Sequence, residues 1–254
     1  MYRIILIFAL LTSLVSGGPY SRTLGRIIGG EEVSVDQVPY LISVRVLGAH
    51  RCGGSLVNSD SVLTAAHCVE EVHVEFLKCV AGTDSRTTGG VSRRADKVII
   101  HGNYKSADFQ NDIAIIKLKE HFEYTGVIQP VRLASSAGAF RRGTKASIAG
   151  WGTRSEDDHF LPVKMYSVDV YAVDFDECVN SYAGVNTVRE GMICTSSPIR
   201  GRDSCEGDAG SPVVVGGTQV GVVSWGQGCA REEYPRVHVE VAHYRSWIDD
   251  QLNE

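Results

Sequence analysis

The sequence predicts an all-β protein with a single helix at its C-terminal end. Many short apolar or alternating runs, rich in Val and Ile, are separated by Gly and polar residues, and their lengths suit strands better than helices. Polar, turn-rich gaps such as 82–90 and 155–159 are typical of surface loops. This pattern is equally compatible with a barrel and with a sandwich.

The expected strands are spread over the whole chain. They are the runs 40–47, 61–65, 98–100, 113–118, 219–224 and 237–241. The expected helix follows the last strand, because Tyr244, Trp247, Ile248 and Leu252 recur at the spacing that places them on one helical face.

Composition and charge exclude several classes of protein. The chain has 254 residues, of which 43% are hydrophobic and 22% are charged, as in ordinary globular proteins. The 25 Lys and Arg against 30 Asp and Glu leave a formal net charge of -5. This mild acidic excess argues against nucleic-acid binding and against a polybasic membrane anchor.

The first 18 residues have the pattern of a secretory signal peptide. One Arg precedes an apolar run at 4–11, and the small residues Ser16, Gly17 and Gly18 follow. A transmembrane anchor is the alternative, but the apolar run is too short to span a bilayer. We therefore expect a secreted, extracellular protein without a membrane span.

Three segments carry the functional motifs. They read Leu-Thr-Ala-Ala-His-Cys at 63–68, Asn-Asp-Ile-Ala-Ile at 111–115 and Asp-Ser-Cys-Glu-Gly-Asp-Ala-Gly-Ser-Pro at 203–212. Each is weak alone, but in this order and spacing they closely resemble the trypsin and chymotrypsin family of serine proteases. The resemblance runs from Arg26 to the C-terminus. It implies two six-stranded antiparallel β-barrels, packed face to face, followed by the C-terminal helix, in a domain at 27–254.

The resemblance assigns the catalytic positions. In that family a Ser attacks the peptide carbonyl, a His removes its proton and an Asp orients the His. His67 and Asp112 match the last two, and Ala209 stands at the nucleophile position. The backbone N–H groups of Gly207 and Ala209 match the oxyanion hole. Ser211 is a poor substitute nucleophile, because it starts from a different backbone position.

The resemblance also outlines a specificity pocket. Its base matches Asp203, the residue type that selects Arg or Lys side chains, and its walls match Ser224, Trp225 and Gly226. Arg236 replaces a Gly of the family in the opposite wall. We hypothesise that Arg236 fills the pocket and pairs with Asp203. The alternative is that Arg236 turns out to solvent.

The family is activated by cleavage, and the corresponding site is present here. The resemblance implies a short propeptide at 19–26 that is removed after Arg26. The freed amine of Ile27 would then pair with Asp208, the residue before the nucleophile position. Alternatively, Arg26 is an inherited site that is not used.

The chain has seven Cys, so at least one has no intrachain partner. The motif positions imply three disulfides, Cys52–Cys68, Cys178–Cys194 and Cys205–Cys229. Cys79 is then either buried and inert or joined to another chain. No Cys and His set has zinc spacing, and we expect no cofactor and no metal.

Because Ala209 cannot form an alkoxide, we expect no enzyme but an inactive homologue of a serine endopeptidase. It would act as a monomer by binding or regulation, with proteases, zymogens, inhibitors or their targets as partners in an extracellular proteolytic cascade, immune or reproductive. One alternative is an active trypsin-like serine endopeptidase. Another is an allosteric cofactor that cleavage after Arg26 switches on.

Overall fold

The computed structural model describes residues 30–136, 138, 140–153, 156, 158, 160–197 and 203–253. The predicted signal peptide and propeptide, with Arg26 and Ile27, lie outside these residues. Within the described ranges, no helix is long and apolar enough to cross a bilayer.

Six strands close into a first antiparallel barrel in the order β2-β3-β4-β7-β6-β5. Two 3-10 helices follow β4. The interior of this barrel is filled by fully buried side chains such as Leu63 and Ile115, which pair across β4 and β7. The elements are β2 (Leu41–Val46), β3 (Ala49–Asn58), β4 (Ser61–Thr64), η2 (Ala66–Cys68), η3 (Val74–Phe76), β5 (Leu77–Ala81), β6 (Val91–Ile100) and β7 (Ala114–Leu118).

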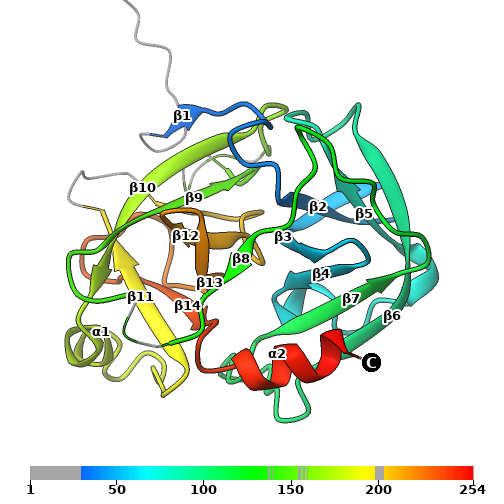
Figure 1. The fold of residues 1–254 in the computed structure, drawn as a ribbon. Coiled ribbons are helices and arrows are strands. Elements are labelled where there is room, and N and C mark those ends of the chain that lie inside the picture. The colour runs from blue at the N-terminus through cyan, green and yellow to red at the C-terminus, as the bar shows by residue number, and fades with distance from the viewer. Residues whose placement is uncertain are drawn as a thin grey trace, which may run out of the picture.

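Six further strands form the second barrel in the order β10-β11-β14-β13-β12-β9, and the pairing of β9 with β10 closes it. The two barrels lie side by side (Figure 1). Two short strands are added outside the closed ring, β1 on β10 and β8 parallel to β13. The elements are β1 (Glu31–Glu32), β8 (Arg132–Leu133), β9 (Lys145–Gly150), β10 (Tyr166–Val173), β11 (Met192–Ser196), β12 (Pro212–Val215), β13 (Thr218–Trp225) and β14 (Arg236–Glu240).

The C-terminal helix α2 (Arg245–Leu252) runs beside the first barrel, as the red helix in Figure 1 shows. Its Ile248 is fully buried in the same apolar cluster as the interior of that barrel. The predicted all-β class with two six-stranded antiparallel barrels and a C-terminal helix is therefore confirmed. Each predicted run overlaps a strand.

The sequence reading missed one helix, α1 (Phe175–Ser181). It is seven residues long, too short to show a clear helical period. Its start is nevertheless encoded locally, because the side chain of Asp174 accepts a hydrogen bond from the backbone N–H of Asp176 at 3.0 Å. Such an N-cap satisfies a donor that the helix leaves without a partner.

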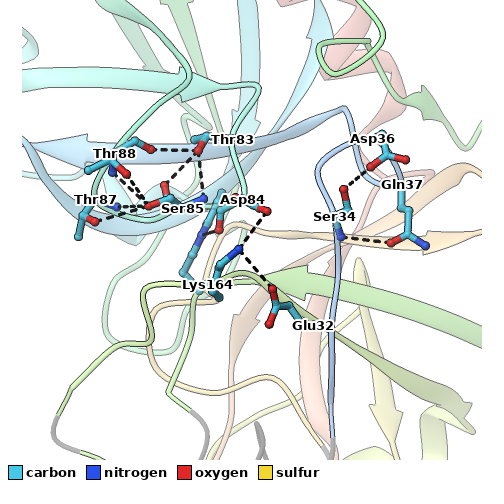
Figure 2. A network of polar contacts seen from close by, with 11 residues as sticks. Glu32, Ser34, Asp36, Gln37, Thr83, Asp84, Ser85, Thr87, Thr88 and Lys164 are labelled. Atoms are coloured by element: carbon cyan, nitrogen blue, oxygen red, sulfur yellow. Dashed lines mark hydrogen bonds and ion pairs between the residues drawn. The ribbon is translucent and has the colours of Figure 1, made fainter.

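A polar network ties the start of the domain to both barrels (Figure 2). The ammonium of Lys164 lies 3.3 Å from the carboxylate of Glu32 and 3.5 Å from that of Asp84. Asp84 belongs to the loop after β5, where Thr83 and Ser85 exchange hydrogen bonds within the turn. The ion pairs are half exposed, so they fix the position of the segments more than they stabilise the fold.

Prediction one concerns the barrel interior. Leu63→Ala should lower the free energy of unfolding by about 2–5 kcal/mol, because it opens a cavity among fully buried side chains. Lys164→Met is the control and should cost less than about 1 kcal/mol, as expected for an exposed ion pair. Denaturant titration of both variants checks this. Equal losses would contradict the assignment of the stabilising core to the barrel interior.

Candidate functional site

One cleft is lined by residues from both barrels, which is where the resemblance predicts the active site. His67 and Phe109 contribute from the first barrel. Gly207, Ala209 and Arg236 contribute from the second. The remaining lining residues include Ser224, Trp225, Gly226 and the Cys205–Cys229 disulfide.

His67 and Asp112 form a hydrogen-bonded pair on the first-barrel side of this cleft. His67 lies in η2, directly after β4, and Asp112 lies just before β7. The imidazole Nδ1 is 2.7 Å from the carboxylate Oδ2, and the backbone N–H of His67 donates to Oδ1 at 2.9 Å. Asp112 is fully buried, while the His67 side chain is 22% exposed. A carboxylate at Nδ1 keeps the proton on that nitrogen and leaves Nε2 as the basic one.

A third group holds the Asp112 carboxylate. The hydroxyl of Ser224, near the end of β13 in the second barrel, donates to Asp112 Oδ2 at 2.5 Å. The pair is thus supported by a group from the opposite barrel, and the carboxylate is fixed by three donors in all.

The position of η2 is set by a disulfide. Cys52 of β3 is joined to Cys68, the residue after His67. The donor atoms of Cys52, His67 and Cys68 all lie within 4.8 Å of one another. Because both sulfurs are in the disulfide, neither is a thiolate, and the cluster does not offer a metal the ligands it requires.

The loop 207–211 places Ala209 on the second-barrel side of the cleft. Its carbonyl accepts a hydrogen bond from the N–H of Gly53 in β3 at 2.8 Å. In the part of the chain that the structure describes, the N–H groups of Gly207 and Ala209 have no acceptor. Gly207 has φ +93°, a left-handed conformation that glycine adopts without strain.

Ser211 lies behind this loop rather than in the cleft. It is fully buried, and its hydroxyl has no hydrogen-bond partner among the described residues. A side chain on Gly53 would collide with that hydroxyl, so Ser211 packs against β3. The rejection of Ser211 as a nucleophile agrees with this placement.

His50 is a site residue that the sequence reading missed. Its Nε2 lies 3.1 Å from the carbonyl of Gly207, and its Nδ1 lies 2.8 Å from the hydroxyl of Ser43. Burial lowers the pKa of His50 to about 4, so the ring is neutral near pH 7. A neutral ring with Nε2–H donating and Nδ1 accepting from Ser43 fixes the peptide after Gly207. The only sequence signal for His50 is that a polar residue stands in a segment that forms a strand.

Arg236 lies inside the pocket, next to Asp203. It is 9% exposed, and its Nε is 3.8 Å from the carboxylate Oδ2 of Asp203. Its Nη2 donates to the carbonyls of Ser204 at 2.7 Å and Gly228 at 3.0 Å. The outward orientation considered from the sequence is not the one in the structure. Burial raises the pKa of the Asp203 carboxyl, and the nearby guanidinium offsets part of this effect.

Aromatic side chains that the motifs did not reveal complete the cleft. Phe109 stacks on Trp225, with ring centroids 6.4 Å apart, and presents its edge to His67 at 5.6 Å. The ring of Tyr182 packs against Trp225, and its hydroxyl donates to the carbonyl of Pro235 at 2.8 Å. No local sequence signal marks them, because their contacts join segments far apart in the chain.

Asp208 lies under the loop, buried from solvent. Its Oδ1 accepts from the N–H of Gly152 at 2.8 Å and its Oδ2 from the N–H of Cys205 at 3.0 Å. Burial nevertheless raises its pKa to about 6, because two amide donors do not replace the lost hydration. Its expected partner Ile27 lies outside the described residues.

The cysteines pair as the resemblance implies, with Cys52–Cys68, Cys178–Cys194 and Cys205–Cys229 bonded. Cys79 is free and fully buried in β5. Burial raises the pKa of its thiol to about 12, so it is protonated and out of reach of a second chain.

Comparison with known proteins points to one family. The sequence model of the family described as Trypsin matches residues 27–248. Trypsin delta of Drosophila melanogaster is 40% identical over 225 residues, covering 88% of this chain and 87% of that protein. Trypsin alpha of the same species is 34% identical and covers 100% of this chain and 99% of its own. The fold matches neuropsin, a serine protease of mouse brain, with a TM-score of 0.81 and 29% identity, over 88% of this chain and 99% of that one.

These comparisons correct one prediction. The prediction drawn from Ala209 was that the chain is not an enzyme. That prediction is wrong in the light of relatives that are named trypsins and a matching structure described as a serine protease. The reading as an inactive homologue therefore gives way to its alternative, a trypsin-like endopeptidase. The reason for the error is that one residue was given more weight than the remainder of the site.

Prediction two concerns pH. In the chain before cleavage after Arg26, the pKa of Asp208 rises from 3.8 to about 6 on folding, so the folded protein keeps a proton that the unfolded chain has lost. The free energy of unfolding therefore falls as pH increases from about 4 to about 6, by roughly 2–3 kcal/mol from this group. Asp208→Asn should remove that contribution. Denaturant titration at several pH values checks it, and a difference between the two proteins that does not vary with pH would contradict it.

Proposed function

Because the chain belongs to the trypsin family of serine proteases, we propose that it binds polypeptides in the cleft between its barrels and hydrolyses a peptide bond there. The observation that carries the proposal is the hydrogen-bonded His67–Asp112 pair. His67 of this pair lines the same cleft as Ala209, opposite the loop whose two backbone N–H groups have no acceptor among the described residues.

The proposed step uses water as the nucleophile, since residue 209 has no hydroxyl and no acyl-enzyme forms there. The water oxygen bonds to the peptide carbonyl carbon while its proton passes to His67 Nε2. The carbonyl electron pair moves to its oxygen, which the N–H groups of Gly207 and Ala209 stabilise. The electron pair on that oxygen then re-forms the C=O bond, the C–N bond breaks with its electrons on nitrogen, and the leaving nitrogen takes the proton from His67. Asp112 stabilises the imidazolium throughout.

The expected rate is modest. Enzymes of this class that lose a member of the triad retain a rate about 10³–10⁴ above the uncatalysed reaction, from the oxyanion hole and from binding. In a related protease, loss of the nucleophile lowers kcat by about 10⁶. The methyl group of Ala209 therefore limits the rate at which this chain hydrolyses peptides, and a hydroxyl at this position should raise that rate.

The site of action follows from the disulfides and the family. Three disulfides persist in an oxidising compartment outside the cytosol. We propose that residues 1–18 direct export, and that cleavage after Arg26 frees the amine of Ile27 for Asp208. That amine would supply the positive charge that the buried Asp208 carboxylate lacks among its present partners. Extracellular polypeptides, including proteases, zymogens and inhibitors that expose a loop, are the proposed partners of the monomer.

Prediction three tests export and processing. Expression of the full chain in insect cells should release it into the medium, and mass spectrometry should find Ile27 at its N-terminus after trypsin treatment. Arg26→Ala should be exported equally but keep the propeptide. Retention of both proteins in the cells would contradict the proposed export.

Prediction four tests hydrolysis. The processed protein should cleave fluorogenic peptides slowly, and Ala209→Ser should raise kcat by at least about 10²-fold, since it restores the covalent step. His67→Ala should lower kcat in both backgrounds, because it removes the general base, and the loss should be larger in the Ala209→Ser protein, where His67 also activates the hydroxyl.

The His67→Ala protein is the matched control, purified in the same way. Hydrolysis that is equal in this protein and in the native one comes from the oxyanion hole and binding or from a contaminating protease, and does not count as activity of His67. If the native protein shows no hydrolysis that depends on His67, the proposed activity is wrong.

A further inference from the structure

The guanidinium of Arg236 changes what the pocket beside Trp225 and Gly226 can bind. Resting on the proposed function, in which peptides occupy the cleft, we propose that this pocket takes a short side chain ending in an oxygen acceptor, a carboxylate or an amide. Arg236 is the residue that selects it. A Lys or Arg side chain, which Asp203 would otherwise attract, is excluded.

The position of Arg236 limits the depth of the pocket. A side chain on Gly226 would meet Nη1 and Cζ of Arg236, so the guanidinium lies against the backbone of the pocket wall. It also lines the cleft. Because Arg236 is nine-tenths buried there, it shortens the pocket from within.

The positive charge of Arg236 opposes the binding of a basic side chain. The carboxylate of Asp203 already faces the guanidinium, with 3.8 Å between Oδ2 and Nε. An incoming ammonium or guanidinium would meet a like charge in a site that excludes water, where repulsion between charges is weakly screened. The negative charge of Asp203 is therefore no longer available to a basic side chain.

Within the described residues, the guanidinium of Arg236 has N–H donors without acceptors. A guanidinium has five N–H groups and no acceptor. Nη2 donates to the carbonyls of Ser204 and Gly228. Nε faces Asp203 and is buried with no hydrogen-bond partner among the described residues, and Nη1 donates to no acceptor in that same part of the chain. Nη1 is therefore the donor that an acceptor oxygen of a ligand in the cleft would satisfy, with a charge-assisted hydrogen bond.

A carboxylate and an amide each offer an acceptor oxygen, but the negative charge of Asp203 repels only the carboxylate. A carboxylate would gain more from Arg236 but would be repelled by the neighbouring Asp203. An amide would gain a neutral hydrogen bond without that repulsion. The two are separated by experiment.

The test uses binding rather than turnover, so that it does not depend on Ala209. The probes are disulfide-closed peptides that mimic an extended inhibitor loop and differ only in the residue that enters the pocket, which is Lys, Glu, Gln or norleucine. Calorimetry with the processed full chain measures their dissociation constants. We expect the Glu or the Gln peptide to bind at least tenfold more tightly than the Lys and norleucine peptides. The tighter of the two identifies the acceptor.

Two variants separate charge from volume. Arg236→Met should keep the pocket filled and abolish the preference, and Arg236→Gly should reverse it in favour of Lys and admit benzamidine, which the native protein should not bind. Arg231→Met is the matched control. Arg231 forms an exposed ion pair with Glu156 at 2.7 Å, and its replacement should leave the preference unchanged.

The native series alone decides the proposal if a variant does not fold. Tightest binding of the Lys peptide, equal binding of all four or binding of none at millimolar concentration would overturn it. Selective binding of an acceptor peptide without any hydrolysis would instead leave the pocket assignment standing and remove only the proposed activity.

Discussion

The site depends on one hydrogen bond between the barrels, from the N–H of Gly53 in β3 to the carbonyl of Ala209. It holds the loop of the second barrel against the strand whose disulfide positions His67. The carbonyl of Gly53 in turn accepts from the hydroxyl of Thr64 at 2.8 Å. This close approach requires glycine at position 53, because any Cβ there would collide with Ser211. The geometry of the cleft is thus a property of the packing of the two barrels and not of either barrel alone.

Residues of local motifs were predictable, and residues that act through long-range contacts were not. The strands followed from Val- and Ile-rich runs, and the positions of His67, Asp112 and Ala209 followed from their immediate neighbours in the chain.

α1 was missed because seven residues show no clear period. His50, Phe109 and Tyr182 were missed because their partners are distant in sequence. Arg236 was found because it replaces a glycine inside a motif, but its bonds to Ser204 and Gly228 needed the structure.

The two departures from the family pattern affect different parts of the site. Ala209 removes a reacting atom and leaves the backbone around it unchanged, since its carbonyl still bonds to β3. Arg236 changes the charge and depth of the pocket and leaves the His67–Asp112 pair unchanged, with its 2.7 Å contact intact. Chemistry and side-chain selection are therefore separable in this chain. The erroneous prediction of a non-enzyme came from the weight given to Ala209 over the remainder of the site.

The buried thiol of Cys79 gives the first barrel an internal reporter. The other six of the seven cysteines are in disulfides, and Cys79 lies in the closed ring of strands with no exposed surface. A thiol reagent can reach it only when β5 separates from its neighbours, so the speed of modification measures how often that ring opens. The same protein, without any added label, thus allows the opening of one barrel to be followed apart from the other.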